Sequence, residues 1–152
     1  MGRREDLLRA EAERWIAFEA GLEAVPAERL ETPGLNAEGW AVRDVMWHVA
    51  HWCSDAARAL TDIAEGRFDR AREPYTADEV NAINDREFER SRSMRANEVR
   101  AELHRARAAM LERFGMLDEL TADADEWFEE SGPLHYVEHL AELRAWASGR
   151  GA

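Results

Sequence analysis

The stretch "WAVRDVMWHVAHWC", residues 40 to 53, decides the fold because its apolar side chains recur every three or four positions. Continued to residue 64, the same period is held by Val42, Val45, Met46, Val49, Trp52, Cys53, Ala56, Leu60 and Ile63. Such a period places one apolar stripe along a helix, and Gly66 is suited to ending it. The pattern predicts a buried helix over residues 42–64, which also carries His48 and His51.

Three further helical regions surround this one. Together the predicted helices cover residues 4–24, 42–64, 76–115 and 134–148. The third begins at a capping box, in which the side chains of Thr76 and Glu79 bond each other's backbone amides. We expect this region to break or kink near residues 91–96, and we interpret "LTADADEWFEESGP" as an acidic connector before the last helix.

The architecture expected from these regions is all-α. No segment alternates convincingly between apolar and polar residues with a period of two, so strands are not expected. Helices with one apolar stripe each bury it by packing together. We therefore predict a four-helix bundle, formed as a single domain by residues 1–152.

Composition and charge exclude several functions. The chain carries a net charge of −12, and its arginines are scattered among glutamates, which argues against binding nucleic acid or an anionic membrane. All 20 basic residues are arginine, so no lysine is present to form a Schiff base or act as a general base. Neither a membrane-spanning run nor an apolar signal segment is seen, and the single cysteine fits a reducing compartment, so we expect a cytoplasmic protein.

Three histidines form the first candidate for chemistry. His135 and His139 are four residues apart, which separates them by roughly 6 Å of rise and about 40° of rotation on one helix face. At this spacing two imidazoles can reach one metal ion. His48 lies beside the buried face of its helix and would complete an open, catalytic type of metal site if the bundle brought it opposite the pair. The alternatives are a coincidental histidine pair and a satisfied core histidine.

Nearby residues have weaker claims on the site. We expect His51 to lie at a helix boundary and to pair with Asp55, one turn further on. Asp44 either orders the free ring nitrogen of His48 or is simply a first-turn acid favoured by the helix dipole. Cys53 is expected to be a small buried residue rather than a ligand or a nucleophile. No role is assigned to His104.

The last helix and the tryptophans supply the remaining candidates. Glu138 and Glu142 flank the histidine pair, and either is a candidate base for a metal-bound water, although both also fit an ordinary solvated face. The chain has six tryptophans in 152 residues. Trp40 and Trp52, together with Trp47 and Trp146, are candidates for the wall of a pocket that binds a small molecule.

These motifs resemble the DinB-like bundle superfamily. "GWAVRDVMWHVAHW" is similar to its first signature, a tryptophan followed by a helix of the form x-V-x-D-x-x-x-H, and "HYVEH" is similar to its His-x-x-x-His pair on the last bundle helix. The resemblance implies a bundle of up-down-down-up type with one longer connection. It also implies a zinc or nickel ion held by His48, His135 and His139.

The superfamily implies particular activities and partners. It includes thiol-dependent enzymes, such as mycothiol-dependent maleylpyruvate isomerase and bacillithiol transferases, and its members are often homodimers. We therefore expect a metal-dependent thiol S-transferase or hydrolase acting on a small molecule, with mycothiol as the candidate thiol. The isomerase itself is not expected, because that subgroup has a glutamate where His135 stands and carries a further C-terminal domain.

A second branch of the superfamily supports a different function. The segment "VNAINDREFERSRSMRANEVRAEL" resembles the ClbS/DfsB branch, which includes a protein that protects its producer from a reactive toxin. That branch generally lacks the complete histidine triad. The alternative function is therefore non-enzymatic sequestration of a small molecule in a tryptophan-lined pocket.

Overall fold

A computed structural model describes residues 2–72 and 75–149 and shows an all-helical chain over that range. Its α-helices are α1 (Arg3–Glu23), α2 (Val42–Ala64), α3 (Ala77–Ser91), α4 (Ala96–Gly115), α5 (Ala122–Ser131) and α6 (Pro133–Ala147), with a 3-10 turn, η1, at Ala27–Arg29. The predicted all-α fold is confirmed. None of the described helices combines the length and apolar character needed to cross a bilayer.

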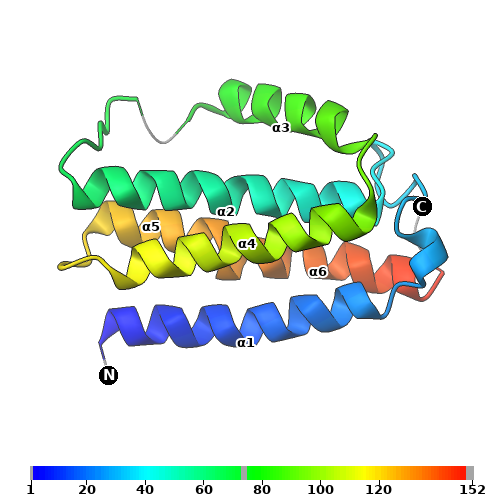
Figure 1. Cartoon of the computed structure of the whole chain (residues 1–152), viewed down its shortest axis with the longest axis horizontal. Coiled ribbons are helices and arrows are strands. Elements are labelled where there is room, and N and C mark those ends of the chain that lie inside the picture. Colours follow the sequence, from blue (N-terminus) through cyan, green and yellow to red (C-terminus); the bar gives the residue numbers. More distant parts are fainter. Residues whose placement is uncertain (1, 73–74, 150–152) are drawn as a thin grey trace.

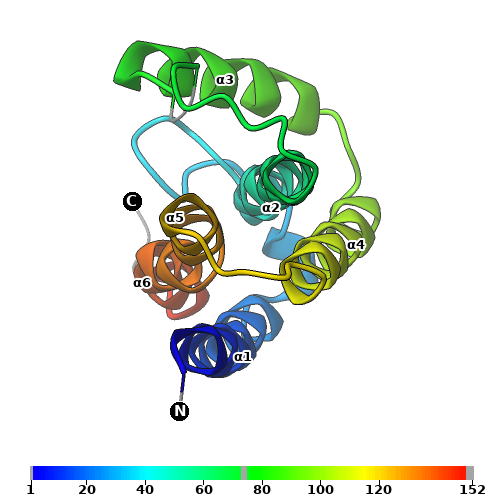
Figure 2. The same cartoon turned by 90° about the vertical axis from the view of Figure 1, so that its left-hand side faces the viewer.

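Four parallel columns make up the bundle (Figures 1 and 2). Three columns are α1, α2 and α4, and the fourth is α5 followed end to end by α6. Helices α2 and α4 run antiparallel to α1, and the α5–α6 column runs in the same direction as α1. This is the expected up-down-down-up order. Helix α3 belongs to the long connection between α2 and α4 and lies outside the bundle.

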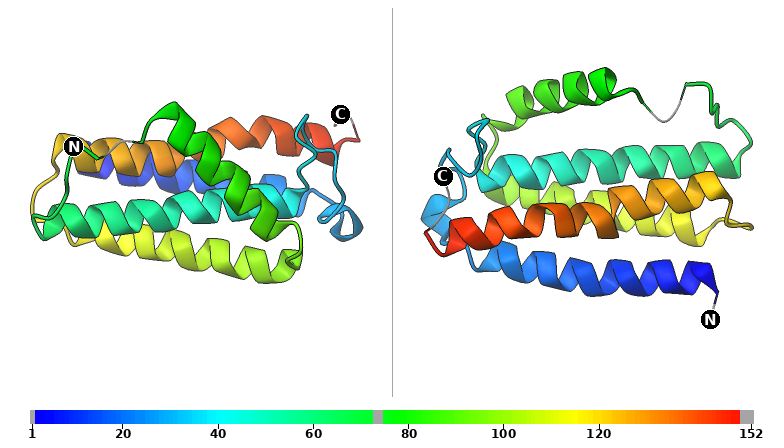
Figure 3. Two further views of the ribbon diagram at one scale, coloured as in Figure 1. Left: turned by 90° about the horizontal axis from the view of Figure 1, so that it is seen from above. Right: turned by 180° about the vertical axis from the view of Figure 1, so that it is seen from behind.

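The position of α3 leaves one side of the bundle open. Seen from above, α3 crosses α2 obliquely, with its first residues on the α5 side and its last residues beside the start of α4 (Figure 3). Only Glu87 and Ser91 of this helix are buried. The indole groups of Trp47 and Trp52 on α2 donate hydrogen bonds to Glu87 and Asn84 of α3. Other residues of α3 line a cavity together with α2, α5 and α6.

Helix α2 supplies the centre of the core. Its apolar stripe is buried as the period predicts, and the helix begins and ends at the predicted residues, Val42 and Ala64. Aromatic side chains from three other columns pack around it, with Phe18 stacked on Tyr136 and Phe114 stacked on Phe128. The predicted break in the third region is also found, since α3 ends at Ser91 and α4 begins at Ala96.

Helix α5 corrects the interpretation of "LTADADEWFEESGP" as a connector. The Thr121 hydroxyl accepts a hydrogen bond from the Ala124 amide at 3.1 Å and so caps the helix, while Asp123 and Asp125 lie in its first turn, where acidic side chains are favoured. Ala124 and Phe128 are fully buried. The acidic residues that suggested a loop are those that stabilise the start of a short helix.

Gly132 joins α5 to α6 at a crowded point. A Cβ atom at this position would lie 3.0 Å from the Phe128 carbonyl oxygen and 3.1 Å from the Met110 methyl carbon. Pro133 follows at the first position of α6, where its missing amide costs no hydrogen bond. The small residue lets α5 end and α6 begin while the column stays packed against α4. The junction therefore fixes the start of α6, the helix that carries His135.

Candidate metal centre

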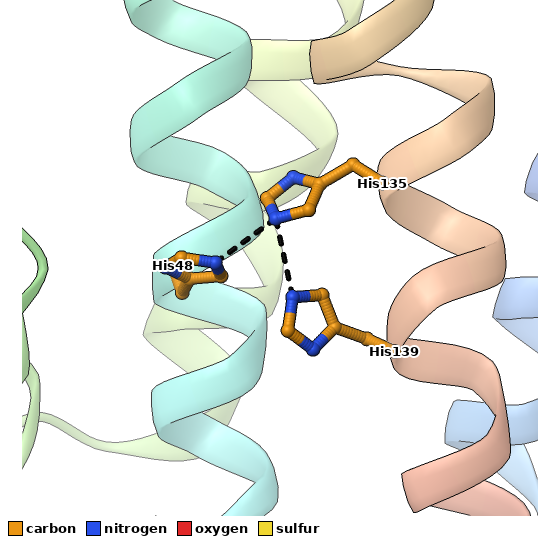
Figure 4. Close-up of side chains that lie close together, drawn as sticks. All are labelled: His48, His135 and His139. Atoms are coloured by element: carbon orange, nitrogen blue, oxygen red, sulfur yellow. Dashed lines mark hydrogen bonds between the residues drawn. The ribbon is translucent and has the colours of Figure 1, made fainter. Parts of the chain in front are cut away.

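Side chains from α2 and α6 bring His48, His135 and His139 together. The Nε2 atom of His135 lies 2.9 Å from that of His48 and 3.1 Å from that of His139 (Figure 4). One ring nitrogen from each residue lies within 4.8 Å of the other two. The packing of α6 against α2 therefore places His48 opposite the His135–His139 pair, which residue spacing alone could not show.

The geometry of the three nitrogen atoms suits a shared cation. A tetrahedral zinc ion with Zn–N distances of about 2.0–2.1 Å would hold its nitrogen ligands roughly 3.3 Å apart. An imidazole nitrogen has a single in-plane position, which holds either a proton or a lone pair. The Nε2 atom of His135 cannot form straight hydrogen bonds to His48 and His139 together. One ion can satisfy all three nitrogen atoms.

Burial keeps the imidazoles of His48 and His135 neutral. The pKa of His48 is lowered from 6.5 to about 3, first by burial and then by the nearby His139 and His51. Burial, followed by His48 and His139, also lowers the pKa of His135 well below 6.5, and only the Ser131 backbone acts in the opposite direction. Neutral imidazole is the form that binds a metal, so these ligands need not lose a proton near pH 7.

A cavity of about 1010 Å³ opens directly onto the histidines. Helices α2, α3, α5 and α6 contribute to its wall, and His48, His135 and His139 all line it. Of the predicted wall residues, Trp40 and Trp52 are part of the lining, whereas Trp47 and Trp146 are not. Aromatic lining residues that the sequence did not identify are Phe68, Tyr75, Phe88 and Trp127.

A known domain family covers most of this chain. The model of the mycothiol maleylpyruvate isomerase N-terminal domain matches residues 8–146, which is most of the chain. The chain belongs to this family. A crystal structure of an uncharacterised protein from Escherichia coli UTI89 has the same fold, with a TM-score of 0.77 and 14% identity over 96% of this chain and 93% of that one. A search of curated proteins found no match.

Within this family member, Glu142 and Glu138 occupy different places around the histidine pair. A carboxylate oxygen of Glu142 lies 3.3 Å from the Nδ1 atom of His139, on the ring edge opposite Nε2. This contact is not a hydrogen bond, because the Nδ1 atom of His139 has no hydrogen-bond partner within the described residues. Glu138 is exposed, and both glutamates line the cavity. Glu142 therefore lies beside a ligand, and Glu138 is the more exposed of the two toward a bound molecule.

Asp44 has the second of its two predicted roles, that of an acid in the first turn. Its carboxylate accepts hydrogen bonds from the Ala41 amide at 2.7 Å and from the Ser91 hydroxyl at 2.7 Å. The first bond stabilises the start of α2, and the second fastens the last turn of α3 to it. Neither bond involves His48. Asp44 thus helps to hold α3, which lines the cavity, against α2.

The predicted pairing of His51 with Asp55 is wrong. The Nδ1 atom of His51 lies 3.5 Å from a carboxylate oxygen of Glu87 on α3. Asp55 instead accepts hydrogen bonds from the Tyr75 hydroxyl at 3.0 Å and from Arg58 at 2.8 Å. The spacing of four within α2 could not anticipate α3, which brings the competing carboxylate.

Cys53 lies in the core, away from the metal ligands. Its side chain is fully buried, and its sulfur lies 3.7 Å from the Ser131 carbonyl oxygen. Burial raises the pKa of the thiol from 9.0 to about 12. A thiol in this state is a poor nucleophile and a poor metal ligand, because both roles need the thiolate.

Proposed function

We propose that this family member is a metal-dependent enzyme that joins a small thiol, or water, to a small electrophilic molecule. The observation that supports the proposal most strongly is the convergence of three imidazole nitrogen atoms, all within 4.8 Å, on the wall of a large cavity. His48, His135 and His139 would hold one divalent ion, zinc or nickel, and leave positions open toward the cavity. Bound there, the ion would lower the pKa of a thiol or water toward neutrality.

The residues around the ligands have separable roles in this proposal. Glu142 would hold the ring of His139 in the orientation that directs its Nε2 atom to the ion. Glu138 lines the cavity and is the candidate group to take up the proton released by the nucleophile. Trp40 packs edge-on against His48, with 5.1 Å between ring centroids, and limits access of water to that side of the site.

A thiol is favoured over water as the nucleophile. The family takes its description from a mycothiol-dependent isomerase, and a cavity of about 1010 Å³ is at the upper end for a single small ligand, which leaves room for a thiol and a second reactant. His135 occupies the position where the isomerase subgroup has a glutamate. We therefore propose an S-transferase, with mycothiol as the candidate thiol, in preference to the isomerase reaction.

Elemental analysis of protein purified without an affinity tag tests the metal site. We expect about one ion per chain in the wild type and in His104→Ala, because His104 is exposed and pairs with Glu19 away from the site. The double variant H135A/H139A should contain none. Full occupancy in that double variant, or an empty wild-type protein after incubation with zinc and nickel, would refute the site.

A screen of small thiols against electrophilic compounds tests the reaction. Thiol conjugation that depends on the ion and is lost in H135A/H139A supports an S-transferase, and turnover without any thiol supports a hydrolase. The second candidate function is sequestration, which the tryptophan-rich wall of the cavity favours. It predicts ligand-dependent quenching of tryptophan fluorescence that persists in H135A/H139A without any turnover.

A further inference from the structure

The cavity wall bears a strong imbalance of charge. Six lining residues are acidic and one is basic, whereas the whole chain has 32 acidic and 20 basic residues. The basic one, Arg70, forms an ion pair with Asp123 and is already neutralised. The cavity is therefore more acidic than the composition of the chain requires, and its field repels anions.

Two of these acids lie together on α5 without a counter-ion. Glu126 and Glu130 are four residues apart and so share one helix face. Within the described residues, no ion pair or hydrogen bond neutralises either carboxylate, while the neighbouring Glu129 is bonded to Arg3. Burial, followed by Glu126 and Glu129, raises the pKa of Glu130. Each carboxylate destabilises the other until a cation is placed nearby.

Three aromatic rings line the same cavity as these two carboxylates. Trp52, Tyr75 and Trp127 all line the cavity, and the ring of Tyr75 packs edge-on against both tryptophans, with centroid separations of 5.9 Å and 6.2 Å. Trp127 directly follows Glu126 on α5. We call these three rings and two carboxylates the aromatic–acidic corner. An alkylammonium group placed over the face of such a ring is held by cation–π attraction, and a carboxylate on the same cavity wall adds to that attraction.

The corner is close to the proposed metal centre. Trp52 follows His48 by one turn of α2, or about 6 Å along the helix. A cation of the chain itself already lies beside this corner, since the Arg58 guanidinium is 5.9 Å from the ring of Trp127 and donates a hydrogen bond to the Tyr75 hydroxyl, without lining the cavity. One small molecule could place a cationic group among the rings while a reactive atom reached the histidines.

We propose that the cavity selects an organic cation, an alkylammonium group joined to an apolar or aromatic body, and rejects anions such as dicarboxylates. As a statement of substrate class this rests on the proposed function. The binding preference itself does not depend on the metal. The alkylammonium group would lie among Trp52, Tyr75 and Trp127, and Glu126 and Glu130 would balance its charge.

A pair of probes with the same body and opposite charge tests the preference. Benzyltrimethylammonium and phenylmethanesulfonate both place a tetrahedral head group on a benzyl unit, and calorimetry measures the dissociation constant of each. We expect the cation to bind at least about tenfold more tightly, as expected for a cation held by several rings and carboxylates. Measurement on the full chain with chelator and again after metal loading separates this preference from any affinity of the sulfonate for the ion.

Charge-matched variants locate the site. E126Q/E130Q removes two charges in the corner, and E112Q/E119Q removes two charges from exposed glutamates outside the cavity, so the change in net charge is equal. The first variant should weaken cation binding about tenfold and the second by less than about twofold. Trp127→Leu, which keeps an apolar side chain, should also weaken it, and circular dichroism would verify that each variant is folded.

The possible results separate the two proposals. Equal affinity for the two probes, tighter binding of the sulfonate to metal-free protein, or equal losses in both double-glutamine variants would overturn the cation preference. Cation binding that is unchanged in both E126Q/E130Q and Trp127→Leu would overturn it too. If one ion per chain is found, such a result leaves the metal centre standing. A selective cation site in a chain that binds no metal would refute the enzyme proposal alone.

Discussion

Replacing Glu11 by alanine should sharply destabilise the bundle, because Glu11 holds a buried network between three columns. Its side chain is 1% exposed, and its two carboxylate oxygens each accept a hydrogen bond from Arg107 of α4 at 2.7 Å. The Tyr136 hydroxyl, on α6 between two of the proposed ligands, donates a further bond at 2.8 Å. The substitution would leave a guanidinium and a buried hydroxyl without their acceptor.

The size of the effect follows from what would be left unpaired. Removing one partner of a buried ion pair costs about 3–5 kcal/mol. The Arg107 side chain is 22% exposed and can recover some hydration, so we expect about 3 kcal/mol. In a chain of this length that corresponds to a fall in melting temperature of roughly 6–12 °C. The apolar pair E11L/R107M should cost less than Glu11→Ala, because it leaves no unpaired charge.

Urea denaturation of metal-free protein, followed by circular dichroism, measures these differences in the free energy of unfolding. Glu102→Ala is the matched control, since this partly buried glutamate contacts Arg105 on its own helix and links no columns. It should change stability by less than about 1 kcal/mol. A loss below about 1 kcal/mol for Glu11→Ala, or an equal loss for E11L/R107M, would contradict the reasoning.

Three further predictions concern individual residues. The pKa of His48 is about 3 in the folded chain and 6.5 in the unfolded chain. As the pH falls from 6.5 toward 3, only the unfolded chain takes up this proton, so metal-free protein should lose stability over that range. The slope from this group is about 1.4 kcal/mol per pH unit, and His48→Gln should remove it in pH-dependent urea titrations. Native Cys53 should not react with iodoacetamide at pH 8 but should do so in urea, as mass spectrometry would show; rapid labelling of native protein would refute its burial. Gly115→Ala should stabilise the chain by about 0.5–1 kcal/mol, because an added Cβ meets no atom within 4 Å and glycine weakens a helix. Gly66→Ala should instead destabilise it by about 1 kcal/mol, because Gly66 has a φ of +72°; thermal melts that failed to separate these two variants would contradict the argument.

Sequence reasoning succeeded where one strong stripe fixed a helix. The period of residues 42–64 gave both ends of α2, because a long buried helix shows its apolar face in every turn. It failed at α5, where a ten-residue helix buries little more than Ala124 and Phe128 and its acidic first turn looks like a loop. A short helix held by a cap and two buried side chains carries too few repeats for a period to be seen.

The candidate site was predictable from the sequence only where neighbouring residues on one helix define it. Spacing alone placed His135 and His139 on one face, but only the packing of α2 against α6 could show that His48 meets them, and the family resemblance supplied that expectation. Tyr75 and Trp127 were missed because they lie in segments without a helical period, beside α3 and on α5. The error at His51 arose because this residue contacts α3, whose packing no local spacing specifies. The same packing gives Asp44 a bond to Ser91 in addition to its predicted role in the first turn of α2.

The division of the fourth column at Gly132 explains how one wall can combine two kinds of chemistry. Before the junction, α5 presents Trp127 and its neighbouring carboxylates, and after it α6 presents the two imidazoles. In a single straight helix, the rotation between Trp127 and the two histidines would be fixed by the helical repeat. The junction instead lets α5 and α6 each direct their own side chains into the same cavity. A Cβ at Gly132 would lie only 3.0 Å from the Phe128 carbonyl oxygen, so a larger residue should displace α6 slightly from α5 and alter the distance between the aromatic–acidic corner and the histidines. A residue that belongs to neither group of side chains thus helps to set the spacing between them.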